Sequence, residues 1–207
     1  ICGEFVCQTG IFFIPAKCQK IAHILIYSLV GSECLCYNNQ IQNETDHFMD
    51  RIVEAYIGEY ASGKSENAVN RALFLAAQGR KVTLVDLDLV EPVYTLRPLI
   101  PLLEGKGVHV IAWKTEETLG LGEAGSILHP AMRWALKNEG DVILDIGYGA
   151  KGSSILNLLE GIEAEKDFKV LFVVNTLRPM TDSVEKIIEY LHEAGPADGM
   201  IANTHLG

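Results

Sequence analysis

The sequence has little positive charge, since 17 Lys and Arg residues stand against 27 Asp and Glu residues and the formal net charge is −10. A protein that binds a nucleic acid through its phosphates needs a basic surface, so this balance argues against a DNA or RNA partner. Long apolar runs are also missing, because the two longest, 11–15 and 21–30, are separated by Lys17 and Lys20 and fall short of a membrane span. No signal peptide is evident at the start of the chain. We therefore expect a cytoplasmic protein whose partners are small molecules or other proteins.

Residues 58–65, GEYASGKS, form a complete GxxxxGK[ST] phosphate loop. The spacing has a chemical reason, since a strand must end, backbone N–H groups must turn towards the phosphates, and a helix must begin beneath them. Gly58 and Gly63 allow the turn because a Cβ atom would crowd it. Lys64 can reach the terminal phosphates, and the Ser65 hydroxyl can bind a magnesium ion. The residues expected to bind the nucleotide here are Gly58, Glu59, Tyr60, Ala61, Ser62, Gly63, Lys64, Ser65 and Glu66.

Short apolar strands alternate with helical patterns along the 207-residue chain, which is 48% hydrophobic and 21% charged. Near-continuous apolar strands between amphipathic helices indicate a mostly parallel sheet covered on both faces. The predicted fold class is α/β, a three-layer P-loop NTPase fold truncated at the C-terminus. Right-handed crossovers put the C-terminal ends of the strands at one edge, where ligands bind in such sheets. The expected strands are 52–57, 81–86, 107–112, 141–145, 169–174 and 199–202, and the expected helices are 66–78, 126–138, 153–161 and 181–194.

Three acidic residues follow strands at this edge. Asp86 and Asp88 come at the end of the second strand in VDLDLVEP, and Asp145 ends the fourth strand in VILDIGYG. A carboxylate in this position can bind magnesium or orient the attacking water, and the alternative for each member of the first pair is a cap or turn role. We expect Asp145, which has the form of a Walker B aspartate, to bind the metal with Ser65, whereas Asp86 and Asp88 could each act at the metal or at the water.

Other residues near the edge have weaker patterns. Gly147 and Gly149 would let the chain pass close to the terminal phosphate, where a backbone N–H could sense it. Arg97 and Arg178 could neutralise a phosphate or a substrate carboxylate, and the alternative is a solvated loop arginine. The histidines have no Ser or Cys partner in a catalytic arrangement, so no histidine is assigned catalysis.

The stretch GEYASGKSENAVNRALFLAAQGRKVTLVDLDLVEP resembles the start of the MinD/ParA-type ATPases and of the related cobyrinic acid amide synthases of the CobQ/CobB type. The likeness runs from about Ile52 to Gly207. It implies that Lys64 binds phosphate, that Asp88 positions the hydrolytic water, and that an asparagine ending the sixth strand contacts adenine. Asn203 in MIANTHLG stands at that place, with Asn175 in VVNTLRP as the competing candidate, and both could be turn formers.

The chain departs from the MinD/ParA pattern at Glu59, where those proteins carry a signature lysine that reaches the partner's nucleotide across a dimer. An acid cannot do this, so the resemblance implies the fold and nucleotide binding, with a homodimer left open. The leading function is Mg-dependent hydrolysis of ATP by Lys64, Ser65, Asp145 and Asp88. The alternatives are an ATP-dependent ligase, amidase or kinase-like reaction on a small acid, and a nucleotide-sensing protein with little turnover. The guanine-specific NKxD motif is absent, which favours adenine.

Residues 1–48 differ from the rest because they hold all the cysteines. Their spacing matches no common zinc or iron–sulfur pattern, and the thiols of a cytoplasmic protein stay reduced. We expect a poorly defined extension with free thiols, read from upstream of a native start at Met49, and one incomplete nucleotide-binding domain over 49–207. The cysteines are Cys2, Cys7, Cys18, Cys34 and Cys36.

Overall fold

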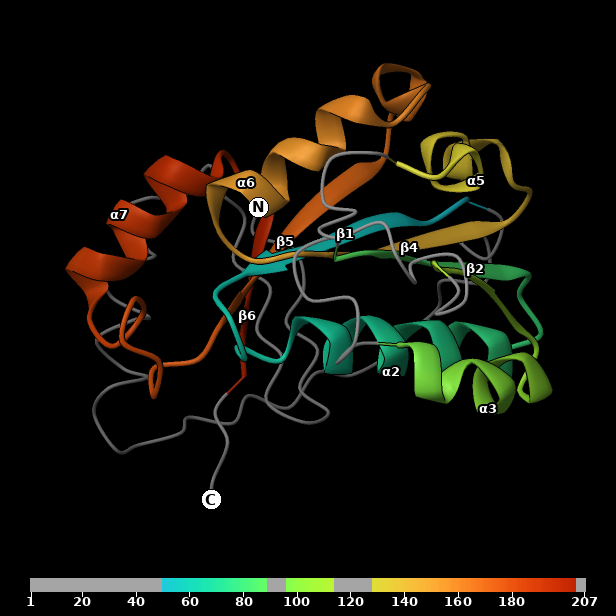
Figure 1. Ribbon diagram of the computed structural model, residues 1–207, viewed down its shortest axis with the longest axis horizontal. Helices are drawn as coiled ribbons and strands as arrows, with labels where there is room; N and C mark the ends of the chain where they lie inside the picture. The colour runs from blue at the N-terminus through green and yellow to red at the C-terminus, as the bar shows by residue number, and fades with distance from the viewer. Residues whose placement is uncertain (1–49, 89–95, 114–127, 204–207) are drawn as a thin grey trace, which may run out of the picture.

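A computed structural model describes residues 50–88, 96–113 and 128–203 (Figure 1). The expected extension over 1–48, with its cysteines and the proposed start at Met49, lies outside the described residues. So do the segments 89–95 and 114–127 and the residues after Asn203. The domain division and the state of the thiols therefore stay predictions.

Six parallel strands form one sheet in the described part of the chain. Each predicted strand is confirmed, with bounds that shift by at most one residue. The order across the sheet is β3-β2-β4-β1-β5-β6, so the strand that precedes the phosphate loop lies near the centre. The strands are β1 (Val53–Gly58), β2 (Val82–Leu87), β3 (Val108–Ile111), β4 (Asp141–Ile146), β5 (Phe168–Val174) and β6 (Gly199–Ala202).

Helices cover both faces of the sheet, which gives three layers (Figure 1). On one face lie α2 (Lys64–Ala77) and α3 (Ile100–Gly105), and on the other lie α5 (Pro130–Arg133), α6 (Gly149–Ser153) and α7 (Val184–Ala194). Successive side chains of a strand point to opposite faces, so Tyr56 joins the apolar cluster beneath α2 whereas Ile57 joins the cluster beneath α7. This double burial explains why β1, β2 and β4 are buried along their whole length.

The helical predictions were partly wrong. In place of a single helix over 126–138, the described residues form the short α5 and a 3-10 turn, Ala135–Lys137, because the backbone leaves the helical region at Trp134 (φ −100°, ψ 15°). The helix expected over 153–161 is α6 followed by a 3-10 turn, Ser154–Leu158, which ends where Leu159 is extended. The prediction missed α3, which carries Pro101 in its first turn.

The last helix, α7, begins three residues later than expected. The Ser183 hydroxyl accepts a hydrogen bond from the backbone N–H of Lys186 and so caps the helix. No helix in the described ranges is long and apolar enough to cross a bilayer.

Candidate functional site

The loop over residues 58–63 joins the end of β1 to the start of α2, as the motif requires. A Cβ atom on Gly58 would lie 2.4 Å from the carbonyl oxygen of Val173, and one on Gly63 would lie 1.9 Å from the Asn203 amide nitrogen. Gly63 also has φ +95°, a conformation that residues with a side chain rarely adopt. Gly58 is therefore required by the close approach of the β5 backbone, and Gly63 by its left-handed conformation.

Lys64 is the first residue of α2 and is only 7% exposed. Its Nζ donates a 2.8 Å hydrogen bond to the carbonyl oxygen of Glu59, so the side chain folds back over its own loop. Burial lowers the pKa of the Lys64 ammonium, while Asp145, Asp88 and Glu59 act in the opposite direction. The carboxylates keep the buried Lys64 ammonium charged, and this charge lies beside the loop where it could stabilise a phosphate.

The acidic residues at the sheet edge lie close together. Asp86 and Asp145 face each other across the parallel pair of β2 and β4, and both are buried. Asp88 follows β2, and its Oδ1 lies 3.0 Å from where a Cβ atom of Gly147 would stand, so it lies against the loop after β4. In the sheet, β4 lies between β1 and β2. Asp145 on β4 therefore lies between Asp86 on β2 and the phosphate loop that follows β1.

The carboxyl group of Asp145 has a strongly raised pKa. Burial, and then the charge of Asp86, raise the pKa of its carboxyl from 3.8 to about 7, while the nearby Ser65 hydroxyl and Lys64 lower it. Both carboxylate oxygens are buried and accept no hydrogen bond of normal geometry from the described residues. A buried carboxylate without a partner is costly unless a cation or an ordered water completes its surroundings.

The donor set fits a magnesium ion that is shared with a nucleotide. Within the described ranges, no three His, Cys, Asp or Glu side chains form a cluster that would hold a metal ion alone. Magnesium is commonly bound by one or two carboxylates together with substrate phosphates and waters, and does not need such a cluster. The orphaned oxygens of Asp145 and the nearby Ser65 hydroxyl provide ligands of the required type.

The two asparagines have different surroundings. The Asn203 amide donates a 2.9 Å hydrogen bond to the carbonyl oxygen of Ser62, so this residue contacts the phosphate loop directly. In Asn175, the side-chain oxygen accepts from the N–H of Leu177 and the backbone oxygen accepts from the Thr181 hydroxyl, which is the geometry of a turn former. The structure therefore brings Asn203, and not Asn175, onto the loop.

The remaining predicted residues differ in exposure and in partners. Tyr60 is 54% exposed and Glu66 is also exposed, whereas the Glu59 carboxylate accepts a 3.0 Å hydrogen bond from the backbone N–H of Met180. Arg178 donates from Nε to the carbonyl oxygen of Ala61 over 3.0 Å. Arg97 starts a 3-10 turn before α3, and among the described residues no hydrogen bond or ion pair joins it to the phosphate loop.

Sequence reasoning missed two tyrosines at the loop after β4. Tyr148 makes an edge-to-face contact with Tyr60, with 5.6 Å between ring centroids. The Tyr190 hydroxyl accepts a 2.8 Å hydrogen bond from the N–H of Gly149, and burial raises the pKa of Tyr190 to about 12. The position of Tyr148 between two glycines was a visible signal, but nothing in the sequence places α7 beside this loop.

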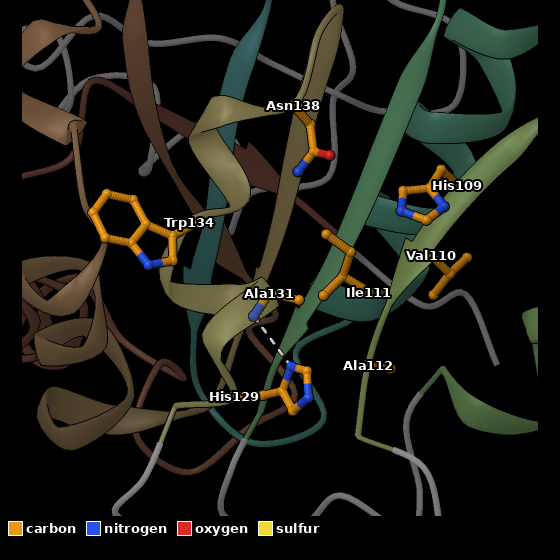
Figure 2. Close-up of a pocket in the computed structure, with 8 residues that line it drawn as sticks. All are labelled: His109, Val110, Ile111, Ala112, His129, Ala131, Trp134 and Asn138. Atoms are coloured by element: carbon orange, nitrogen blue, oxygen red, sulfur yellow. Dashed lines mark hydrogen bonds between the residues drawn. The ribbon is translucent and has the colours of Figure 1, made fainter.

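A separate hollow of about 390 Å³ lies beside the edge strand β3 and α5 (Figure 2). Its walls include His109, His129 and Trp134, and no residue of the phosphate loop. His129 caps α5, because its Nδ1 accepts a 3.1 Å hydrogen bond from the N–H of Ala131, as Figure 2 shows. This cap gives His129 a structural role, and sequence analysis assigned it no catalytic one.

No protein-family model matches this chain, and no curated protein matches it. Solved structures that are similar include the signal recognition particle receptor FtsY from Elizabethkingia anophelis, at 16% identity and a TM-score of 0.47, over 70% of this chain and 48% of that one. The same receptor in complex with GDP matches at 16% identity and a TM-score of 0.48, over 84% and 55%. FlhF complexed with GTP and Mg²⁺ matches at 15% identity and a TM-score of 0.45, over 73% and 55%.

The likeness is one of fold only. This chain spans about half the length of the structures that it matches. The fold class is established by the molecule itself, which has an all-parallel sheet between two helical layers and a phosphate loop between the central strand and the helix that follows. The chain therefore has the three-layer α/β fold of P-loop NTPases, as the sequence predicted.

Proposed function

We propose that this chain binds ATP as its magnesium complex at residues 58–65 and hydrolyses the β–γ bond. The observation that carries the proposal is the surroundings of Asp145, whose two buried oxygens accept no hydrogen bond of normal geometry from the described residues although Ser65 and Lys64 lie close by. The negative charge of a buried carboxylate is costly by itself and is stabilised by a cation beside it. An activity that consumes ATP also favours the cytoplasm as its location.

The phosphate contacts follow from the loop and its helix. α2 is 14 residues long and begins at Lys64, so the partial positive charge of its N-terminus is directed at the loop. The Lys64 ammonium, which is bonded to the Glu59 carbonyl, would exchange that oxygen for a phosphate oxygen. Ser65 and Asp145 would hold the magnesium ion, which supplies positive charge to the outer phosphates.

Asp88 is the residue that we assign to the attacking water. It is half-buried against Gly147 at the end of β2, and its charge acts on both Lys64 and Asp145. An alternative is that Asp88 faces a small acid in a ligase, amidase or kinase-like reaction. The hydrogen bond between Gly149 and Tyr190 favours a third candidate, a nucleotide sensor, because it links the loop after β4 to α7.

The proposal also covers which nucleobase is bound and to which proteins the chain is related. The sequence has no NKxD motif, and Asn203 follows β6 and contacts the loop, so we propose adenine as the base. We also propose a relation to the MinD/ParA-type and CobQ/CobB-type proteins, on the sequence pattern over residues 52–207. Glu59 stands at the position of the signature lysine, and its carboxylate accepts a hydrogen bond from the backbone N–H of Met180. This argues against the cross-dimer contact of the MinD/ParA members.

Calorimetry with Mg-ATP and Mg-GTP tests nucleotide binding. We expect wild-type protein to bind ATP more tightly than GTP, and Lys64→Ala to lose the binding because the buried charge at the phosphates is gone. Lys81→Ala is the matched control, since this exposed lysine pairs with the exposed Glu139. If Lys64→Ala binds as tightly as the control, the phosphate loop is not the site.

Phosphate release separates the three functions. Turnover of ATP alone that is lost in Asp88→Ala supports hydrolysis. Turnover that requires an added small carboxylic acid supports the ligase, amidase or kinase-like alternative. Tight binding with no release under either condition supports the sensor, and overturns hydrolysis.

A further inference from the structure

The segment between β5 and α7, residues 175–183, is built by its own hydrogen bonds. The Asn175 carbonyl oxygen accepts from the N–H of Arg178 over 3.0 Å and from the Thr181 hydroxyl over 2.7 Å. The Asn175 side chain accepts from Leu177, and both Asn175 and Thr181 are buried. A segment fixed in this way can hold a neighbouring loop, because its own ordering does not depend on that neighbour.

Two hydrogen bonds join this segment to the phosphate loop in opposite directions. Glu59 of the phosphate loop accepts through its carboxylate from the backbone N–H of Met180. Arg178 of the segment donates from its guanidinium Nε to the carbonyl oxygen of Ala61. Each side thus offers a charged side chain to the backbone of the other, and both hydrogen bonds lie at the exposed surface. We call these two contacts the reciprocal tie.

The tie acts at the most strained part of the loop. Ala61 has φ +52°, and it is the one described residue other than glycine with a positive φ. The C=O of Ala61 and the N–H of Ser62 belong to one planar peptide and point in opposite directions. The N–H of Ser62 bonds the carbonyl oxygen of Glu59, which also receives Lys64. Arg178 therefore fixes the peptide that closes the turn on which the lysine rests.

The same geometry decides between two roles for Arg178. The phosphates of a bound nucleotide are expected on the side to which the loop's N–H groups point. Arg178 bonds a carbonyl oxygen, so its Nε is directed at the loop backbone and is occupied there. This contact favours a positioning role over the neutralisation of phosphate that the sequence left open.

We propose that Arg178 and Glu59 are positioning residues that hold the phosphate loop in its binding conformation before nucleotide arrives. The consequence for affinity rests on the proposed nucleotide binding, whereas the consequence for loop order does not. Loss of the tie lets Ala61 relax from its left-handed conformation, and the loop must then be reordered each time it binds.

The test compares Arg178→Met, which keeps most of the side-chain volume without a donor, with Arg178→Lys, which retains one. Arg133→Met is the matched control, because Arg133 pairs with Glu160 on a different part of the chain. We measure hydrogen exchange of residues 58–65 in the full chain without nucleotide, the Kd for Mg-ATP, and the free energy of unfolding. Arg178→Met should speed exchange in the loop and weaken binding about tenfold at nearly unchanged stability. Arg178→Lys should recover part of both losses.

The second arm asks whether the two contacts act together. Glu59→Met should change loop exchange and the Kd for Mg-ATP as Arg178→Met does. Glu59→Gln should change them less, because glutamine keeps an acceptor. The double variant Glu59→Met with Arg178→Met should lose little more affinity than either single variant. Unchanged loop exchange in Arg178→Met overturns the proposal, as do fully additive losses or an effect that only follows global stability. If wild-type protein binds no nucleotide but Arg178→Met still speeds exchange, the proposed function fails and the tie stands.

Discussion

Replacing Asp145 with asparagine should make the protein more stable above neutral pH. The carboxyl is fully buried and its pKa is raised from 3.8 to about 7, chiefly by burial and then by Asp86. A raised pKa means that the folded protein binds a proton at Asp145 which the unfolded chain releases between these two values. The contribution of Asp145 to the free energy of unfolding is therefore highest below pH 3.8 and is lost as the pH rises towards 7.

The size of the effect follows from the same two values. At about 1.4 kcal/mol for each pH unit, the charged form of Asp145 should cost about 4 kcal/mol above pH 7 and about 2 kcal/mol at pH 5. The amide of the Asp145→Asn variant would mimic the neutral carboxyl in shape. The difference in unfolding free energy between this variant and wild type should therefore grow from near zero at about pH 4 to roughly 4 kcal/mol at about pH 8. Subtracting the two curves cancels the other titrating groups.

Urea unfolding at several pH values, without magnesium or nucleotide, measures this difference. Binding of Mg-ATP should be lost in the same variant, because its amide brings no negative charge to the cation. A stability difference that does not change between about pH 5 and about pH 8 would refute the reasoning, since it would mean that Asp145 is charged in the folded protein across this range. Asp182→Asn is the control, because Asp182 is an exposed partner of Lys186.

Three further outcomes are expected. Arg71→Met should lower the unfolding free energy by about 3 kcal/mol, since it leaves the buried Glu54 carboxylate without its 2.9 Å partner, and the added change Glu54→Leu should restore much of the loss in urea unfolding. Gly63→Ala should abolish binding of Mg-ATP in calorimetry, because alanine is strained at a φ of +95° and its methyl group would displace the Asn203 amide from the loop; unchanged affinity would contradict this account of the loop. Tyr190→Phe should cost about 1 kcal/mol in thermal unfolding by removing the acceptor of the Gly149 N–H, and no loss would mean that water replaces the hydroxyl.

The strands and the phosphate loop could be predicted because their signals are local. A buried parallel strand must be apolar on both faces, so the run before Gly58 and the run before Asp145 identify themselves. The loop motif fixes the spacing of Gly58, Gly63 and Lys64 for a chemical reason that needs no knowledge of the rest of the chain. Short helices were predicted less well, because α5 ends where Trp134 leaves the helical region and the 3-10 turn after α6 ends where Leu159 is extended, and packing decides those ends.

The neighbours of each site residue depended on contacts between distant parts of the chain. The sequence indicated that Asp86, Asp145 and Lys64 meet at one sheet edge, but the strand order sets β4 between β1 and β2 and gives Asp145 its central place. The partners of Glu59 and Gly149 come from the segment after β5 and from α7, far along the chain, and no periodicity encodes them. The sequence by itself therefore determined the chemistry available to this protein, and the tertiary structure decided which of those groups are buried, paired and held beside the phosphate loop, because burial and pairing depend on long-range packing.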